Sequence, residues 1–288
     1  MRGFSNVDNT CYLAAALQCL LHTPQLVNYL LADDACATGD LNTRKRNAAA
    51  LTKEIMALTH QMWKEPEGDP LCLDAAVVAL RKHAKPFAKG SMHDAHECIL
   101  ALVDALHQGL SKTPRVTRSL AREALREKDL AAWDDAVARD YSFLAEVFQG
   151  QMVHDRGTYE HFWSLSLHVA AGDSITQLLD HHLQDARVTY APLILVIHFN
   201  RFDPSGAKVE KFIDYGTELE FAGASYALFA VCMHTGAHYT AMCENRGHWT
   251  FYDDAVCTPT TDPNAIIQRD AYVLFYKKLI DACQPNTQ

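Results

Sequence analysis

The sequence lacks several features by which common protein classes are recognised. Its nine cysteines are scattered, and no two of them have the Cys-x-x-Cys spacing of a zinc knuckle. The longest apolar run, around residues 191–199, has the length of a buried strand, whereas a membrane helix needs roughly 18 to 20 apolar residues. The chain also has no internal repeat and no low-complexity segment. These absences argue against a zinc-knuckle protein, a membrane protein and a repeat protein.

Basic residues are also fewer than acidic ones. Lys and Arg number 26 against 35 Asp and Glu, which gives a formal net charge of −9. Nucleic-acid binding requires clustered Lys and Arg, so nucleic acid is not expected as a partner and a basic partner is mildly favoured. The first residues are polar and lack the apolar segment of a secretory signal. Together with the odd number of cysteines, this predicts an intracellular protein of the cytoplasm or nucleus.

The composition is that of a globular protein. With 288 residues, of which 49% are hydrophobic, the chain can bury a full core without disulfides or metals. The first half is rich in periodically apolar segments, and Ser91, three residues before Asp94, predicts a capped helix start. Helices are expected from about Cys11 to Leu21 with Asn9 or Thr10 as the cap, around residues 51–62 and 73–80, through residues 99–106 and, as a solvated amphipathic helix, over residues 119–140.

The second half changes character after Tyr141, where aromatic and β-branched residues alternate with turn signals. Strands are expected at residues 143–153, 162–169, 193–202, 218–221, 226–233, 238–243, 249–252 and 271–277. Helices followed by strands predict an α+β fold, with a helical subdomain at residues 1–140 and a β-rich subdomain at residues 141–288. The junction between two such subdomains is a natural cleft.

Cys11 stands at the predicted start of the first helix. Unpaired N–H groups and the helix dipole favour the thiolate there, which is the nucleophilic form of the side chain. A cysteine at a helix start is more often structural, so this position alone does not identify a nucleophile. His238 and Asp253 lie on two strands that we expect to be antiparallel neighbours. Such strands can bring a base and an orienting acid together, as nucleophilic catalysis requires.

Five sequence blocks resemble those of the ubiquitin-specific proteases and occur in that family's order. The segment GFSNVDNTCYLAAALQ at residues 3–18 resembles the cysteine box, and residues 226–256 resemble the histidine box with its double acid. Between them, HDAHE (93–97), EHFWSLSL (160–167) and PLILVIHFNRF (192–202) resemble the Gln-Asp-Ala-x-Glu box and two strand motifs. The resemblance implies a papain-like cysteine peptidase fold with thumb, palm and fingers, and a deubiquitinase activity.

The resemblance assigns roles to five residues near the predicted cleft. Cys11 would attack the carbonyl of the C-terminal glycine of ubiquitin, His238 would take the thiol proton and later protonate the leaving lysine amine, and Asp253 would hold the imidazole. Asn6 matches the position that stabilises the oxyanion, where an uncharged donor suits a charge that develops only in the tetrahedral state. Asp254 matches a secondary polar support. No cofactor is implied.

Three further residues match positions along the channel for the basic, glycine-ended tail of ubiquitin. Asp94 and Glu97 would face this tail, which fits the acidic balance of the chain, although helix capping and solvation would explain the same two acids. Tyr239 would narrow the channel so that only a Gly-Gly end can pass. The expected partners are ubiquitin, polyubiquitin chains and ubiquitinated proteins.

Two segments depart from the family's pattern. The fingers of this family usually carry two Cys-x-x-Cys pairs, but residues 153–157 contain no cysteine, and residues 184–191 are too short for a finger and lack a metal pair. Reduced fingers without zinc are therefore expected, with a smaller grip on the globular body of ubiquitin. Asp8 replaces a glycine of the cysteine box, which is tolerable because Asp adopts left-handed backbone angles at modest cost. The loop before His238 is cut to residues 235–237.

Two alternatives remain open. The fingers are the part of the fold that would discriminate between modifiers, and they are reduced here. The chain could therefore cleave another ubiquitin-like modifier that shares the Gly-Gly end. It could also be an inactive or weakly active ubiquitin-binding scaffold, but the presence of Asn6, Cys11, His238 and Asp253 together speaks against this. A metal-dependent hydrolase is a distant third, because the sequence has neither a His-Glu-x-x-His motif nor a cysteine cluster.

Overall fold

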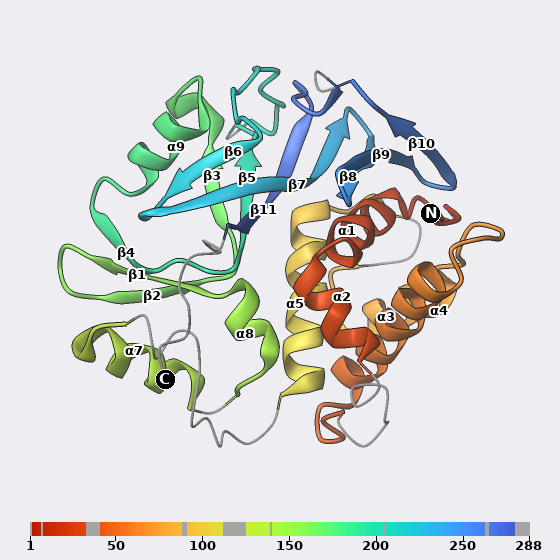
Figure 1. The fold of residues 1–288 in the computed structure, drawn as a ribbon, viewed down its shortest axis with the longest axis horizontal. Helices are drawn as coiled ribbons and strands as arrows, with labels where there is room; N and C mark the ends of the chain where they lie inside the picture. Colours follow the sequence, from red (N-terminus) through yellow and green to blue (C-terminus); the bar gives the residue numbers. More distant parts are fainter. Residues whose placement is uncertain are drawn as a thin grey trace.

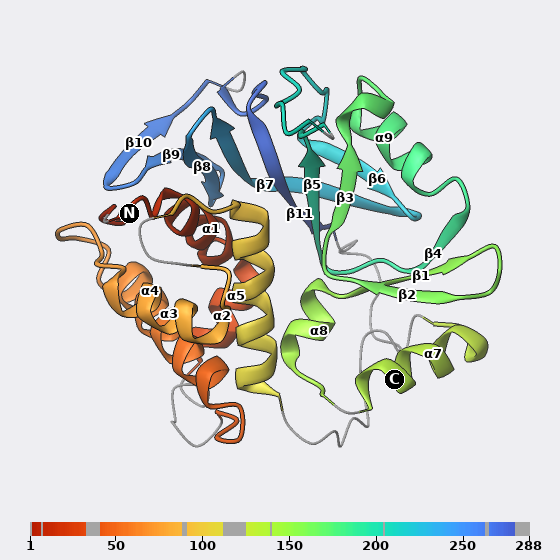
Figure 2. The same cartoon turned by 180° about the vertical axis from the view of Figure 1, so that it is seen from behind.

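The structure is a computed structural model that describes residues 2–6, 8–32, 41–87, 91–111, 125–138, 140–203, 205–262 and 265–279. Figures 1 and 2 show the helices of residues 11–110 grouped on one side of the molecule, with strands of the second half of the chain above and beside them. Within the described ranges, no helix combines the length and the hydropathy that crossing a bilayer requires. The mixed helix-and-sheet architecture confirms the predicted α+β class.

The helices come mainly from the first half of the chain. They are α1 (Cys11–Leu21), α2 (Pro24–Leu31), α3 (Arg46–Lys64), α4 (Asp74–His83), α5 (Ala95–Leu110), α7 (Glu127–Val137), α8 (Phe143–Phe148) and α9 (Ile175–His182), with a 3-10 turn at Val169–Ala171. The start of the first helix is confirmed at Cys11. Thr10 occupies the cap position, but its side chain makes no capping hydrogen bond.

The strands form two sheets. They are β1 (Gly150–His154), β2 (Tyr159–Phe162), β3 (Leu165–His168), β4 (Ala186–Tyr190), β5 (Ile194–Asn200), β6 (Glu218–Phe221), β7 (Ala224–Thr235), β8 (His238–Asn245), β9 (His248–Asp253), β10 (Val256–Thr260) and β11 (Ala271–Lys278). The larger sheet has the order β10-β9-β8-β7-β11-β5-β3, with β6 paired to β7. In it β3 and β5 run parallel, and the other pairs run antiparallel.

The larger sheet separates two apolar cores. Along β8, the side chains of Tyr239, Ala241 and Cys243 belong to the core shared with α1, α3 and α5, while Met242 belongs to the core on the opposite face. This is the alternation that a strand imposes on successive side chains. Every residue of α1 is buried because the helix packs against both the sheet and α5. The start of α1 is thereby held near the ends of β8 and β9 (Figure 1).

The predicted strand over residues 143–153 is wrong in its first half, where the chain forms α8 and only Gly150–His154 is a strand. Ser142 caps this helix, because its Oγ accepts a hydrogen bond from the Leu144 N–H at 3.2 Å. Residues 144–148 are all buried where α8 packs against α5 and β5. A short helix buried on all sides has the same continuous apolar pattern as a buried strand, which explains the error.

Two helix predictions also need correction. The cap of α5 is Asp94 and not Ser91, since Asp94 Oδ1 accepts a hydrogen bond from the Glu97 N–H at 2.9 Å. Of the helix predicted over residues 119–140, the part before residue 125 lies outside the described residues, and α7 covers Glu127–Val137. That helix is more than a solvated one, because Trp133 is fully buried and packs edge-on against Tyr190.

The segments for which the sequence predicts reduced fingers form the smaller sheet, with the order β2-β1-β4. β1 and β2 make a hairpin whose turn contains Gly157 at φ 79°, and β4 pairs with the other side of β1. Neither β4 nor β10 was expected from the sequence. β4 has a mixed polar pattern, and β10 contains Pro259, which is tolerated there because the strand lies at a sheet edge.

Candidate active site

Cys11, the candidate nucleophile, follows a sharp turn. Asp8 and Asn9 have φ values of 59° and 60°, left-handed angles that Asp and Asn adopt more readily than most residues. The turn brings Asn6 back against the helix start, where its Oδ1 accepts hydrogen bonds from the Thr10 N–H at 2.9 Å and from the Thr10 hydroxyl at 3.2 Å. Asp8 therefore does what a glycine does at this position in the family pattern.

The segment before this turn is fixed to the end of the larger sheet. The Phe4 N–H donates to the Asp254 carbonyl at 2.8 Å, and the Leu71 N–H donates to the Gly3 carbonyl at 2.9 Å. A Cβ atom on Gly3 would lie 2.4 Å from the Asp254 carbonyl oxygen, so only glycine allows this approach. The segment thereby ties the loop that carries Asn6 to the turn after β9.

His238 and Asp253 form a direct pair at one end of the sheet. His238 is the first residue of β8, Asp253 is the last residue of β9, and the two strands are antiparallel neighbours. The distance from His238 Nε2 to Asp253 Oδ1 is 2.7 Å. Because Nε2 is engaged by the carboxylate, Nδ1 is the ring nitrogen that can exchange a proton with a thiol. A two-residue turn with Gly236 at φ 68° joins β7 to β8 and sets the start of β8.

Asp254 connects this pair to Asn6. Its Oδ2 accepts a hydrogen bond from Asn6 Nδ2 at 2.8 Å and lies 3.9 Å from His238 Nε2. Its Oδ1 is buried and has no hydrogen-bond partner among the described residues. Burial raises the pKa of this carboxyl, while the Asn6 amide and the His238 ring oppose the rise. The structure thus places two hydrogen-bonded pairs, His238 with Asp253 and Asn6 with Asp254, side by side, with His238 Nε2 and Asp254 Oδ2 3.9 Å apart.

The Cys11 thiol lies at the same end of β8 and is 5% exposed. Burial raises the pKa of Cys11, the backbone N–H of Tyr239 lowers it through a hydrogen bond, and the negative charge of Asp254 raises it again. The net direction for the pKa of Cys11 is upward, opposite to the one that a helix start alone favours, because burial is the largest influence on it. A neutral thiol needs a base before it can attack, and His238, next to Tyr239, is positioned to supply one.

Asp94 and Tyr239 lie in one cluster between α5 and the sheet. Asp94 Oδ1 caps α5, and Asp94 Oδ2 accepts a hydrogen bond from the Tyr272 hydroxyl. The Tyr239 ring is buried and stacks on His234 with centroids 4.4 Å apart. Burial, and then the charge of Asp94, raise the pKa of the Tyr239 hydroxyl. Glu97 is separate from this cluster, because its side chain is exposed on the first turn of α5.

The contact between Tyr272 and Asp94 could not be found from the sequence. Tyr272 lies in the predicted strand 271–277, whose aromatic pattern indicates burial but names no partner, and 178 positions separate it from Asp94. Gly3 belongs to the segment that resembles the cysteine box, but its contact with the turn after β9 could not be predicted from the sequence either, because it forms only in the folded chain.

Among the described residues, one group has enough ligand atoms close together to hold a metal ion, namely His238, Asp253 and Asp254. His238 is hydrogen-bonded to Asp253, and Asp254 is hydrogen-bonded to Asn6. Contacts within the protein therefore explain the cluster without a metal ion.

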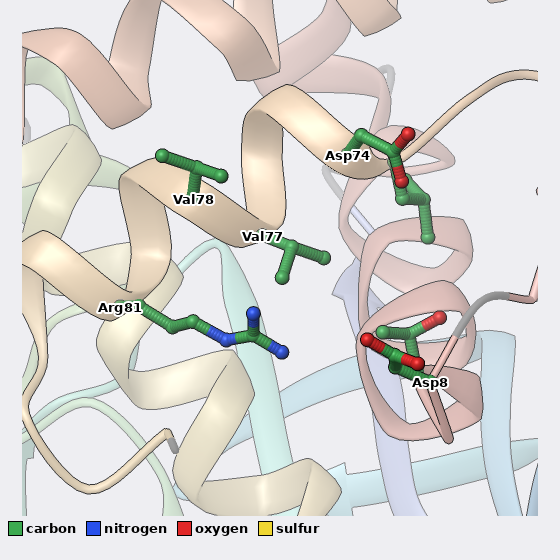
Figure 3. A pocket seen from close by; sticks show the side chains of 7 residues that line it. Asp8, Asp74, Val77, Val78 and Arg81 are labelled. Carbon is green, nitrogen blue, oxygen red and sulfur yellow. The ribbon is translucent and has the colours of Figure 1, made fainter. Parts of the chain in front are cut away.

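A small cavity of about 170 Å³ lies beside the turn that precedes Cys11. Figure 3 shows the Arg81 side chain extending from α4 toward this space, with Asp8 on the opposite side. The cavity is also lined by three further residues of α4, namely Asp74, Val77 and Val78. The cavity borders the loop that carries Asn6, and its two carboxylates and one guanidinium give it mixed charge.

The whole described fold matches one known family. Residues 2–276 match the family model described as ubiquitin carboxyl-terminal hydrolase. Ubiquitin carboxyl-terminal hydrolase 2 of Rattus norvegicus is 27% identical, covering 96% of this chain and 54% of the rat protein. Ubiquitin carboxyl-terminal hydrolase 4 of Saccharomyces cerevisiae is 26% identical, covering 96% of this chain and 39% of the yeast protein. The chain thus spans about half or less of the length of these relatives.

Solved structures show the same fold. The yeast SAGA DUB module superposes with a TM-score of 0.73 at 20% identity, covering 97% of this chain and 66% of the solved one. A SAGA DUB module with Ubp8, Sgf11, Sus1 and Sgf73 bound to monoubiquitin gives 0.72 at 19% identity, covering 97% and 69%. These likenesses extend over nearly the entire chain and confirm the fold expected from the sequence blocks.

Proposed function

The chain belongs to the ubiquitin carboxyl-terminal hydrolase family, and on this premise we propose that it is a cysteine-type deubiquitinase. It hydrolyses the isopeptide or peptide bond after the C-terminal glycine of ubiquitin. The observation that carries the proposal is the pair of His238 and Asp253, 2.7 Å apart. His238 begins β8, and the backbone N–H of the next residue, Tyr239, hydrogen-bonds the Cys11 thiol. A base, its orienting acid and a buried nucleophile meet there.

The reaction follows from these positions. His238 Nδ1 takes the proton of the Cys11 thiol as the sulfur attacks the glycine carbonyl, and Asp253 stabilises the resulting imidazolium. When the tetrahedral adduct collapses, His238 returns the proton to the leaving lysine amine and a thioester remains on Cys11. A water molecule, deprotonated by His238, then attacks the thioester and releases the free carboxyl end of ubiquitin and the thiol.

Asn6 is the proposed donor to the oxyanion. One N–H of its Nδ2 is engaged by Asp254, and the other can point toward the attacked carbonyl. Thr10 holds the amide oxygen, so the side chain is fixed at both ends before substrate arrives. A donor that needs no reorganisation stabilises developing charge most effectively. Asp254 is accordingly proposed as a positioning residue for Asn6.

The tail of ubiquitin is proposed to enter between α5 and the sheet, past Asp94, Glu97 and Tyr239. Both carboxylate oxygens of Asp94 are engaged by protein groups, so its main contribution is to hold the channel wall. Glu97 is exposed and remains available to a basic side chain of the tail. The buried ring of Tyr239 borders the path next to His238 and excludes bulky residues from it.

The larger organisation is part of the same proposal. Residues 1–140 act as the thumb, residues 141–288 as the palm, and the sheet of β1, β2 and β4 stands where longer fingers occur in the family pattern. The partners are ubiquitin, polyubiquitin chains and ubiquitinated proteins, in the cytoplasm or nucleus. The small sheet favours a reduced grip on the ubiquitin body.

The direct test is hydrolysis of isopeptide-linked ubiquitin by the purified chain. We expect release of free ubiquitin by the wild type and none by Cys11→Ala, with Cys257→Ala, at a half-buried thiol of β10, as the matched control that retains activity. The same assay with other Gly-Gly-ended modifiers identifies the preferred one. Cleavage of another modifier but not of ubiquitin would replace the ubiquitin assignment, and cleavage of none would leave the scaffold alternative.

A further inference from the structure

A second, larger cavity of about 520 Å³ opens beside the catalytic pair. Its lining includes His238 and Asp253 themselves, the side chains of Met233, Met242 and Thr258, and neighbouring residues of β7 to β10. We propose that this cavity receives the acceptor, meaning the segment of the modified protein that surrounds the ubiquitinated lysine. The proposal rests on the deubiquitinase function argued above. It adds a binding site for the acceptor, the part of the substrate that leaves with the lysine amine.

Strand alternation places this cavity on the face of the sheet opposite to α1. On β8, His238 and Met242 line the cavity, whereas Tyr239 and Cys243 pack in the core that contains α1 and α5. On β9 the pattern repeats, because Phe251 and Asp253 line the cavity while Tyr252 packs on the α1 side. The sheet itself therefore separates the cavity from the Asp94 and Tyr239 cluster.

The two faces meet at His238, where the bond is cut. A scissile amide has an acyl side and an amine side, which leave the reacting carbon in different directions. The acyl side, which ends in glycine, is assigned to the channel between α5 and the sheet. The amine side must then continue past the group that protonates the leaving nitrogen, which is His238. The cavity begins at that residue and is continuous with it.

The chemistry of the lining fits an extended peptide with a lysine side chain. Met233 and Met242 are buried in the floor and offer adaptable apolar surface for the four-carbon stem of lysine. Thr258 offers a hydroxyl at the wall, which can hydrogen-bond the backbone of a peptide. The Asp253 carboxylate faces the space in which the leaving amine becomes an ammonium ion.

Charge also restricts the acceptor. Asp270, also in the lining, is paired with Lys208 at 3.3 Å, and the same ammonium is shared with Glu210 at 3.3 Å. Asp253 is shared with His238. Among the described residues that line the cavity there are two carboxylates and no Lys or Arg. The preferred acceptor is therefore a peptide whose residues next to the modified lysine are neutral or basic, and acidic residues at those positions are disfavoured.

A variant that fills the cavity tests the proposal. Thr258 is exposed at the rim on β10, so Thr258→Trp can occupy the space without altering the buried floor. The matched control is Thr217→Trp, at an exposed threonine next to β6, away from the cavity. Two substrates are compared, ubiquitin joined through its glycine to the ε-amine of free lysine, and ubiquitin joined in the same way to the lysine of a short neutral peptide.

We expect the wild type and Thr217→Trp to prefer the peptide-linked substrate by kcat/KM, and Thr258→Trp to lose about tenfold of that preference, equal to about 1.4 kcal/mol. Circular dichroism and thermal unfolding report whether each variant is folded. An unchanged preference in folded Thr258→Trp would overturn the proposal, as would a wild type that cleaves both substrates equally. A wild type that cleaves neither substrate would contradict the proposed function itself.

Discussion

At the scale of single residues, the candidate site consists of a buried thiol, whose pKa burial raises, and a hydrogen-bonded pair of His238 and Asp253. Sequence blocks predicted Cys11, His238 and Asp253 as site residues, and antiparallel pairing of β8 and β9 explains why positions 238 and 253 meet. The raised pKa of Cys11 could not be predicted, because burial of this helix start depends on contacts with the sheet and α5. The contact between Tyr272 and Asp94 could not be predicted either, because no local sequence pattern indicates which distant residue a side chain will contact.

The two adjacent acids should contribute differently to the rate. Asp253 touches the imidazole directly, so Asp253→Ala should lower kcat by roughly 10²- to 10⁴-fold, the range for loss of effective acid–base catalysis. Asp254 acts through Asn6, so Asp254→Asn should lower kcat by less and leave the pH profile of kcat/KM in place. Steady-state kinetics over pH distinguish the two effects. Equal losses in both variants would contradict the assignment of Asp253 as the residue that holds His238.

Gly3 should be required for both stability and activity. In Gly3→Ala the added Cβ meets the Asp254 carbonyl oxygen at 2.4 Å, so the N-terminal segment must move away from the turn after β9. We expect a loss of about 1 to 3 kcal/mol in the free energy of unfolding, typical of overpacking, together with a fall in kcat because Asn6 shifts. Gly157→Ala is the control, since its Cβ meets open space in a distant hairpin. It should cost roughly 1 to 2 kcal/mol through its positive φ and leave kcat unchanged.

At the scale of secondary-structure elements, the long periodic helices and most strands followed from the sequence, and each error has its own cause. α8 was taken for a strand because complete burial removes the helical periodicity, and β10 was missed because its edge position tolerates a proline. The sequence predicted Ser91 as the cap of α5, whereas the cap in the structure is Asp94. Both residue types cap helices, and only the backbone conformation decides between them.

The start of α5 allows capping to be separated from substrate binding. Asn caps helices as well as Asp does, so Asp94→Asn should retain the fold and, if Asp94 only holds the channel wall, should leave KM for ubiquitin substrates close to that of the wild type. Glu97→Gln should raise KM instead, because an exposed charge that contacts the basic tail is lost. A higher KM for Asp94→Asn than for Glu97→Gln would show that Asp94 acts directly on substrate.

The junction between α5 and β5 should make the protein sensitive to acid. The rings of His96 and His198 stack 4.0 Å apart, and Ser164 and Ser166 hydrogen-bond to them at 2.8 and 2.9 Å. Burial lowers the pKa of His198 to about 2 and also lowers that of His96. Both histidines are neutral in the folded state and take up protons when the chain unfolds in acid. The contribution of each to stability is complete above the ordinary histidine pKa of about 6.5 and is lost as the pH falls toward its lowered folded-state pKa, which is about 2 for His198.

We therefore expect the free energy of unfolding to fall below pH 6.5 by up to about 1.4 kcal/mol per pH unit for each such histidine. His198→Phe keeps a stacked ring without a titrating group, so its unfolding free energy should depend less steeply on pH between 6.5 and 4. Denaturant titrations at several pH values measure this slope. The idea fails if the variant shows the same slope as the wild type.

At the scale of the whole molecule, one large sheet organises the chain. Its inner face shares a core with α1, α3 and α5 and leads to the ends of β8 and β9, where Cys11, His238 and Asp253 lie. Its outer face has a separate core and carries the cavity that borders His238. The α+β class and the family resemblance were predictable from five sequence blocks, whereas the small sheet of β1, β2 and β4 was anticipated only as shortened fingers.

The central claim is that Cys11 is the nucleophile that attacks the C-terminal glycine of ubiquitin. The most direct measurement is intact-mass and peptide mass spectrometry after incubation with ubiquitin that carries a thiol-reactive group at its C-terminus. We predict one ubiquitin per chain, attached at Cys11, with no adduct in Cys11→Ala and much slower labelling in His238→Ala. An adduct on any other cysteine, or labelling that persists in Cys11→Ala, would contradict the account.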